Sequence, residues 1–180
     1  MDAYTIILVQ SLRNLFFDYL SLFFDFVFST KILIPFFLIM FLVFLIKKHK
    51  NAFVICSSLV LMSATVKAIK EIVRRPRPEF TLNLPITSHS VFSFPSGHTA
   101  AAFLLAVLLS KYYPKYKIVF YSAAILTGFS RIYLGVHYLS DVFFGALIGV
   151  IIAFFALAHE KQINSLGEKI IKLTNTFSSS

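Results

Sequence analysis

The sequence predicts an all-α protein, a polytopic membrane bundle of about six helices forming a single domain over residues 1–180. Composition is the first indication, because 58% of the residues are hydrophobic and 14% are charged, whereas soluble domains are about 45–50% apolar. The second is the pattern, in which uncharged runs alternate with short charged segments. The single cysteine, Cys56, lies within an apolar run and forms no internal disulfide.

Five apolar runs predict five membrane-crossing helices. They cover residues 32–46, 51–66, 99–110, 118–130 and 142–158. Several of these runs are shorter than the roughly 20 residues that cross about 30 Å of hydrocarbon. We therefore expect the helices to include flanking residues, with Lys31 and Lys47 extending toward the interface.

Residues 1–30 are expected to form an amphipathic first helix, whose position the sequence leaves open. Polar residues at spacings of three and four draw one stripe along it, namely Ser11, Asn14, Asp18, Ser21 and Asp25. Such a helix either lies in the membrane interface or crosses the membrane with its stripe toward the bundle. Crossing would give six transmembrane helices and place both termini on one side.

The basic residues indicate both a partner and an orientation. The net charge of +9 is spread between apolar runs, which favours anionic lipid and the bilayer, and no nucleic acid, as the partner. Lysines are more numerous around residues 47–50, 111–117 and 161–172, so that side is expected to be cytoplasmic. Residues 161–180 then form a cytoplasmic tail, and the proline-rich loop 74–95 faces outward.

Three polar clusters are expected at the outer membrane face. They read KEIVRRPRP (70–78), FPSGHT (94–99) and SRIYLGVHYLSD (130–141). Charged groups within so apolar a chain are costly and usually functional. Since all three clusters lie at the same side of the predicted bundle, we expect them to meet in one site there.

The first two clusters suit an anion. Lys70 and Arg77 offer fixed positive charge and, in the arginine, forked donors that match phosphate. Ser96 and Gly97 stand where a helix is expected to begin, so that backbone N–H groups point at a bound anion, with His98 in the first turn. Taken singly, each cluster also fits membrane-flanking charge or an ordinary turn.

The third cluster combines a base with a carboxylate. His137 and Asp141 are four residues apart, which predicts that they share one helix face. A carboxylate on one imidazole nitrogen leaves the other free as a base or nucleophile. Arg131 would point elsewhere on a continuous helix, so a turn is expected at Gly135, with Arg131 ending one helix and His137 opening the next. A structural salt bridge is the alternative role for Arg131 and Asp141.

The spacing of these residues resembles the three-part motif of the type-2 phosphatidic acid phosphatase superfamily. This family includes lipid phosphate phosphatases, has a six-helix membrane core and is similar to vanadium haloperoxidases in its active site. The matching positions are Lys70, Arg77-Pro78, Pro95-Ser96-Gly97-His98, Ser130-Arg131, Gly135, His137 and Asp141. The register is unique, because a motif ending at Arg75-Pro76 would need a lysine at Ala68.

The resemblance implies a role for each matching residue. His137 would attack phosphorus and form a phosphohistidine, with Asp141 orienting it, and His98 would protonate the leaving oxygen and then activate water. The phosphoryl oxygens would be held by Lys70, Arg77, Ser96, Gly97 and Arg131. The resemblance implies no metal and no other cofactor.

The function expected from the resemblance is a metal-independent phosphatase acting on a lipid head group at the periplasmic or exterior face of a bacterial inner membrane. Lipid A 1-phosphate or undecaprenyl diphosphate, a polyprenyl substrate, is favoured over phosphatidylglycerol phosphate, because Arg74 and Arg75 add positive charge that could bind a second anionic group of the substrate. Two alternatives stay open. The same site could transfer phosphate to a second lipid, or the chain could bind or transport anionic lipid without catalysis.

Overall fold

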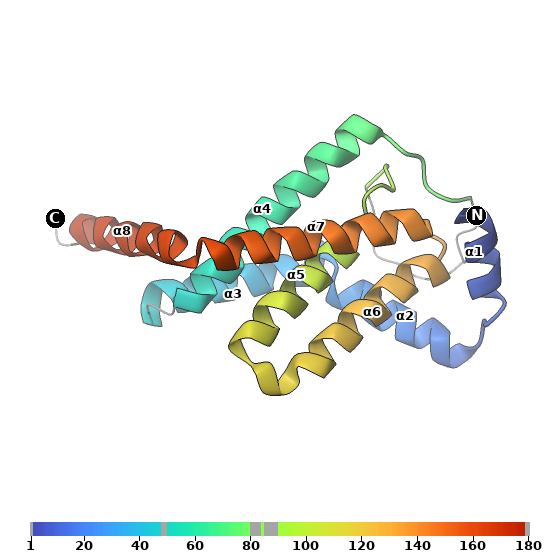
Figure 1. Ribbon diagram of the computed structural model, residues 1–180, viewed down its shortest axis with the longest axis horizontal. Coiled ribbons are helices and arrows are strands. Elements are labelled where there is room, and N and C mark those ends of the chain that lie inside the picture. The colour runs from blue at the N-terminus through green and yellow to red at the C-terminus, as the bar shows by residue number, and fades with distance from the viewer. Residues whose placement is uncertain (1, 48–49, 80–83, 85–89, 179–180) are drawn as a thin grey trace.

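The computed structural model describes residues 2–47, 50–79, 84 and 90–178. Over these ranges the chain forms eight α-helices and one short 3-10 helix, with no strand, which confirms the all-α prediction. The helices are α1 (Asp2–Gln10), α2 (Leu15–Val27), α3 (Thr30–Lys47), α4 (Lys50–Val73), α5 (Gly97–Tyr112), η1 (Pro114–Tyr116), α6 (Lys117–Tyr133), α7 (Leu139–Ala158) and α8 (Glu160–Ser178). Figure 1 shows their arrangement.

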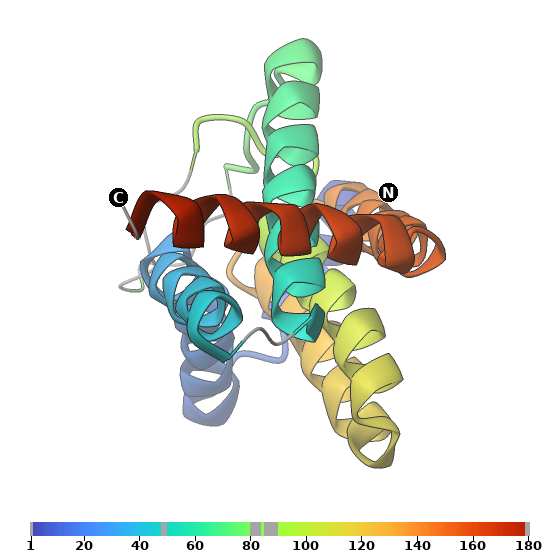
Figure 2. The same cartoon turned by 90° about the vertical axis from the view of Figure 1, so that its left-hand side faces the viewer.

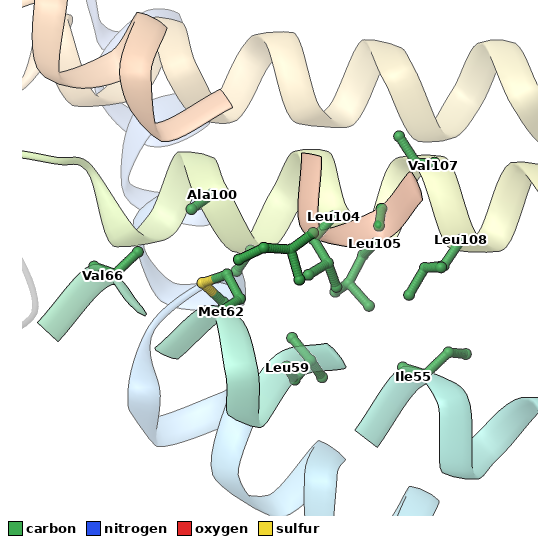
Figure 3. Close-up of a cluster of buried hydrophobic side chains, with 12 residues drawn as sticks. Ile55, Leu59, Met62, Val66, Ala100, Leu104, Leu105, Val107 and Leu108 are labelled. Carbon is green, nitrogen blue, oxygen red and sulfur yellow. The ribbon is translucent and has the colours of Figure 1, made fainter. Parts of the chain in front are cut away.

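Helix α5 is the centre of the bundle and packs against α4, α6 and α7. Its residues from Thr99 to Leu108 are almost all buried, as expected of a helix that is apolar on every side. Side chains of α4 and α5 interdigitate in the main core (Figure 3), which includes Ile55, Leu59, Met62, Val66, Leu104 and Leu108. The core therefore fixes the N-terminus of α5 relative to the end of α4.

Two glycines bring α7 close to α5. A Cβ atom on Gly145 would lie 2.5 Å from the carbonyl oxygen of Ser96, and one on Gly149 would collide with the carbonyl oxygen of Ala100. Small residues allow such close approach of helices in a membrane, where packing rather than the hydrophobic effect holds helices together. The contact joins the start of α5 to the first half of α7.

The first thirty residues do not form one helix. They form α1 and α2, which meet at an angle of 120°. Asn14 causes the break, because its side chain caps α2 by accepting a hydrogen bond from the Phe17 N–H at 3.0 Å. The C-terminal part of the polar stripe is buried on α2 and consists of Asp18, Ser21 and Asp25. Helix α2 packs against α6.

Helices cover all five predicted apolar runs. By length and composition, Asn51–Val73 and Leu139–Ala158 are each able to cross a membrane, and the α1–α2 pair would count as a third span if taken together. The apolar part of α3, Lys31–Phe44, is shorter. In Figure 1, α1 lies beside the end of α6 and α8 lies at the opposite end of the molecule. Helices α1 and α8 thus lie at opposite ends of the molecule (Figure 1), whereas six crossings would place both termini on one side.

Residues 161–178 of the expected cytoplasmic tail belong to helix α8, and residues 179–180 lie outside the described residues. Apolar residues recur at helical spacing from Ile163 onward, and Gly167 is buried next to the rings of Phe44 and Phe53. Figure 2 shows α8 lying across the end of the bundle, in front of α3 and α4. This helix closes the end remote from the polar clusters.

Candidate active site

The segment between α6 and α7 carries His137 on a turn. Helix α6 ends at Tyr133, Gly135 has a φ of 69°, and α7 begins at Leu139. Glycine adopts this left-handed conformation without steric cost, so the turn predicted at Gly135 is confirmed. Arg131 lies in the last turn of α6, as expected. His137, however, precedes α7 by two residues and does not open it.

Asp141 approaches His137 by capping α7, and the two residues do not share a helix face. Asp141 is the third residue of α7, and its Oδ2 accepts the Tyr138 N–H at 3.0 Å. A carboxylate at this position turns back over the start of its helix. The same Oδ2 thereby lies 3.4 Å from Nδ1 of His137. This contact favours a proton on Nδ1 and leaves Nε2 as the atom with a lone pair.

Arg75 holds the other oxygen of Asp141. Its Nη1 donates to Oδ1 of Asp141 at 2.8 Å and to Oγ of Ser140 at 2.7 Å. The guanidinium also lies over the Tyr138 ring, 3.9 Å from its centroid. The sequence-based hypothesis gave Arg75 and Arg74 to a second anionic group of a substrate. Arg75 instead belongs to the support of Asp141, while Arg74 is exposed and donates from Nε to the Glu71 carbonyl.

Arg77 lies on the open side of His137. Its Nη1 is 3.4 Å from Nε2 of His137 and donates to the Val136 carbonyl at 2.6 Å. Burial lowers the pKa of Arg77 to about 10, an effect that the charge of Asp141 opposes and that of Arg131 reinforces. The guanidinium is therefore still charged at neutral pH, beside the nitrogen that carries the lone pair.

Lys70 reaches the same region from the last turn of α4. Its Nζ donates to the carbonyls of Phe92 and Ser93 at 2.7 and 3.1 Å. Arg77 also donates, from Nε, to the Ser90 carbonyl at 2.8 Å. Both cations thus bind carbonyl groups of residues 90–93. Because these groups are neutral, an anion such as phosphate could displace them.

The second cluster begins α5, as predicted. Ser96 is the N-cap, Gly97 is the first helical residue, and His98 lies in the first turn. The Ser96 N–H donates to the Asp141 carbonyl at 3.0 Å, which joins the second and third clusters through the backbone. Its Oγ lies 2.9 Å from Oγ1 of Thr99 and accepts the Thr99 N–H. The Ser96 hydroxyl is thus directed at its own helix.

One cavity of about 490 Å³ unites the three clusters. Five of the eight predicted site residues line it, namely Lys70, Arg77, Gly97, His98 and His137. Its remaining wall is largely apolar and comes from α3, α4, α5, the residues just before α3 and residues 90–92, with Phe28, Leu33, Met62, Val66 and Ala101 among its apolar side chains. The cavity therefore combines a cationic end, where both imidazoles lie, with an apolar side.

The other three predicted residues, Ser96, Arg131 and Asp141, are fully buried behind this wall. Arg131 donates from Nη1 to Oδ1 of Asp25 at 2.5 Å, and from Nε and Nη2 to the Ser130 hydroxyl. Sequence reasoning missed Asp25 as part of the site. Its signal was present in the polar stripe of residues 1–30, but the spacing alone did not indicate a partner.

Two histidines, one supported by a carboxylate, stand among cationic and N–H donors at one end of a membrane bundle. This arrangement defines a site suited to phosphoryl groups. The sequence profile of the PAP2 superfamily matches residues 51–164, and the chain belongs to this superfamily. The resemblance inferred from the three motifs is thereby confirmed.

Relatives of known activity share the matched region. Phosphatidylglycerophosphatase B from Bacillus subtilis (strain 168) is 36% identical over 114 residues, which are 57% of this chain and 55% of that protein. Lipid A 1-phosphatase from Rhizobium johnstonii is 38% identical over 98 residues, 49% of this chain and 38% of that protein. The alignments thus span about half or less of each relative's length.

A solved structure shares the fold. The crystal structure of a transmembrane PAP2-type phosphatidylglycerolphosphate phosphatase from Bacillus subtilis superposes with a TM-score of 0.75 at 26% identity. The superposition covers 90% of this chain and 85% of that one. It includes helices outside the matched region 51–164, so the likeness extends to the N-terminal helices.

Proposed function

We propose that this protein is a metal-independent phosphatase that removes a phosphate from a lipid head group through a phosphohistidine. The observation that carries the proposal is the shared cavity, because His98 and His137 line it together with Lys70 and Arg77. Membership in the PAP2 superfamily and the lipid phosphatases among its relatives support the same reaction class.

In the first step Nε2 of His137 attacks phosphorus. The N–P bond forms as the bond from phosphorus to the lipid oxygen breaks, and protonated His98 gives its proton to that leaving oxygen. Asp141 supports the attack in two ways, since it keeps the proton on Nδ1 and stabilises the positive charge that the ring acquires. The lipid leaves as an alcohol, or as a monophosphate where the substrate is a diphosphate.

In the second step water attacks the phosphohistidine. His98, now neutral, accepts a proton from the water as its oxygen bonds to phosphorus, and the electron pair of the N–P bond returns to Nε2 of His137. Inorganic phosphate is released and both histidines regain their starting protonation. The two rings need opposite protonation states, so the rate should fall at both acid and alkaline pH.

The cationic end of the cavity would hold the phosphoryl oxygens. Lys70, Arg77 and Gly97 line the cavity, whereas Ser96 and Arg131, which do not line it, would act from behind its wall. Donors that are in place before charge develops stabilise a phosphoryl-transfer transition state without reorganisation. A bound phosphate would replace the carbonyls that Lys70 and Arg77 now contact.

The apolar side of the cavity suits the hydrocarbon part of the substrate. With the phosphate at the cationic end, the chain would lie along Phe28, Leu33, Met62 and Val66. We place the site at the outer face of a bacterial inner membrane, as the lysine distribution predicts. Because Arg75 is bound to Asp141, the charge argument for lipid A 1-phosphate or undecaprenyl diphosphate is reduced to Arg74. Phosphatidylglycerol phosphate is an equal candidate.

The test is phosphate release in detergent from these three lipids, with EDTA present throughout. We expect EDTA-resistant release from at least one lipid, and its loss by at least a thousandfold in the folded variants His137→Ala and His98→Ala. The Glu79→Ala variant alters an exposed residue of the loop between α4 and α5 and serves as the control. Release that survives unchanged in His137→Ala would refute the proposal.

A further inference from the structure

Residue Asp25 lies outside the region that defines the family, yet it is part of the site. It is 1% exposed, on helix α2, whereas the PAP2 profile begins at residue 51. Its Oδ1 accepts from Arg131 at 2.5 Å and lies 3.8 Å from Nε2 of His98. One carboxylate oxygen thus faces both a phosphate-binding candidate and the proposed acid.

The position of Asp25 is fixed by the packing of α2 on α6. One helical face of α2 buries Asp18, Ser21 and Asp25. Two turns before Asp25, Oδ1 of Asp18 accepts the Tyr133 hydroxyl at 2.5 Å. Since α6 also carries Arg131, the two aspartates attach α2 at two points along α6. The carboxylate of Asp25 is therefore held in place.

The surroundings of His98 explain what a carboxylate does there. A leaving-group acid must be protonated when the lipid oxygen departs. His98 shares its cavity with the cations of Lys67, Lys70 and Arg77, with His137, and with the carboxylate of Glu71. Arg131 also lies nearby, through their common contact with Asp25. Positive neighbours disfavour an imidazolium, whereas a carboxylate within about 4–6 Å favours it.

We propose that Asp25 is a positioning residue that keeps His98 protonated among the cations of the phosphate site and fixes Arg131 behind it. The inference rests on the proposed function, because it assumes that His98 acts as the acid. It also gives helix α2, which lies outside the family profile, an indirect part in the chemistry. The carboxylate does not touch the reacting atoms, so it acts through the two residues that it holds.

The test compares the pH dependence of kcat in Asp25→Asn with wild type. We expect the alkaline limb of the profile to move to lower pH by about one unit or more, so that kcat at pH 8 falls roughly tenfold. The acid limb, which reports His137 and Asp141, should stay in place. Loss of the carboxylate should lower kcat more than it changes KM.

Asp18→Asn is the matched control, because Asp18 is buried on the same face of α2 but contacts Tyr133 and Arg13 rather than the site. It should lower thermal stability without moving either limb. If Asp25→Asn does not fold, Asp25→Ser takes its place, since the smaller side chain leaves room for water beside Arg131. If neither limb of the pH profile moves in a folded Asp25 variant, whatever its kcat, the inference is wrong.

The two proposals can fail separately. If His98→Ala abolishes phosphate release but Asp25→Asn leaves the pH profile unchanged, the phosphatase proposal stands and the role of Asp25 falls. If His98→Ala retains activity, the proposed function itself is wrong. Titration of His98 by NMR of ring-labelled histidine adds a readout that needs no turnover, and His98 should lose its proton at lower pH in Asp25→Asn.

Discussion

Arg75 contacts the candidate site without lining its cavity. Its guanidinium binds the side chains of Asp141 and Ser140 and stacks on the Tyr138 ring. Asp141 in turn lies against Nδ1 of His137. The chain of contacts Arg75–Asp141–His137 would therefore support the proposed nucleophile, and it joins the first and third clusters.

The variant Arg75→Met tests this support. Removing a hydrogen-bonded charge costs about 1.5–3 kcal/mol, so we expect kcat to fall roughly tenfold to hundredfold, with KM nearly unchanged across lipids. The control is Arg74→Met, because Arg74 is exposed and bonded only locally to the Glu71 carbonyl among its described contacts. An increase in KM confined to multiply charged lipids would instead favour the earlier hypothesis that Arg75 binds a second anionic group.

Helices α5 and α7 approach each other closely at two glycines of α7, Gly145 and Gly149. Gly145 lies against the Ser96 carbonyl at the N-terminus of α5. At the same end of α5, the Ser96 N–H donates a hydrogen bond to the Asp141 carbonyl of α7. The backbone of α7 thus fixes the position of the Gly97 N–H relative to His137.

Gly145→Ala should therefore damage the site through the backbone. The added methyl group would lie 2.5 Å from a carbonyl oxygen, and overpacking of this kind costs about 1–3 kcal/mol. We expect lower thermal stability together with a loss of kcat. Gly167→Ala is the control, because its methyl group meets the ring of Phe53 at the remote end, and it should leave kcat unchanged. Wild-type kcat and stability in Gly145→Ala would contradict this account.

The elements also show what sequence reasoning could reach. The five apolar runs, the cap at Ser96 and the turn at Gly135 were predictable, because each depends on local chemistry. The break at Asn14 was not, since a capping residue within a regular polar stripe reads equally well as part of one helix. The pairing of Asp25 with Arg131 depends on how α2 packs on α6, which no local pattern encodes.

At the scale of the whole molecule, the site and helix α8 occupy opposite ends. Helix α1 is attached beside the site, where Gln10 donates to the Tyr133 carbonyl at 3.2 Å, whereas α8 closes the far end (Figure 1). If the bundle crosses a membrane, the two ends face opposite compartments. The lysine distribution predicts that the α8 end is cytoplasmic.

Cysteine labelling tests this orientation in a Cys56→Ser background. The variants Ser11→Cys and Ser165→Cys alter exposed residues of the two ends. We expect a membrane-impermeant maleimide to label the first in intact cells and the second only after permeabilisation. Labelling of both from the same side would contradict the arrangement and would favour six crossings.

The proposed mechanism requires that His137 carry the phosphoryl group during turnover. The most direct measurement is rapid quenching with a ³²P-labelled lipid substrate, followed by mass spectrometry of the labelled peptide. We expect an acid-labile, base-stable phosphate on His137, absent from His137→Ala and unaffected by EDTA. Lipid turnover in the complete absence of label at residue 137, or label on another residue, would contradict it.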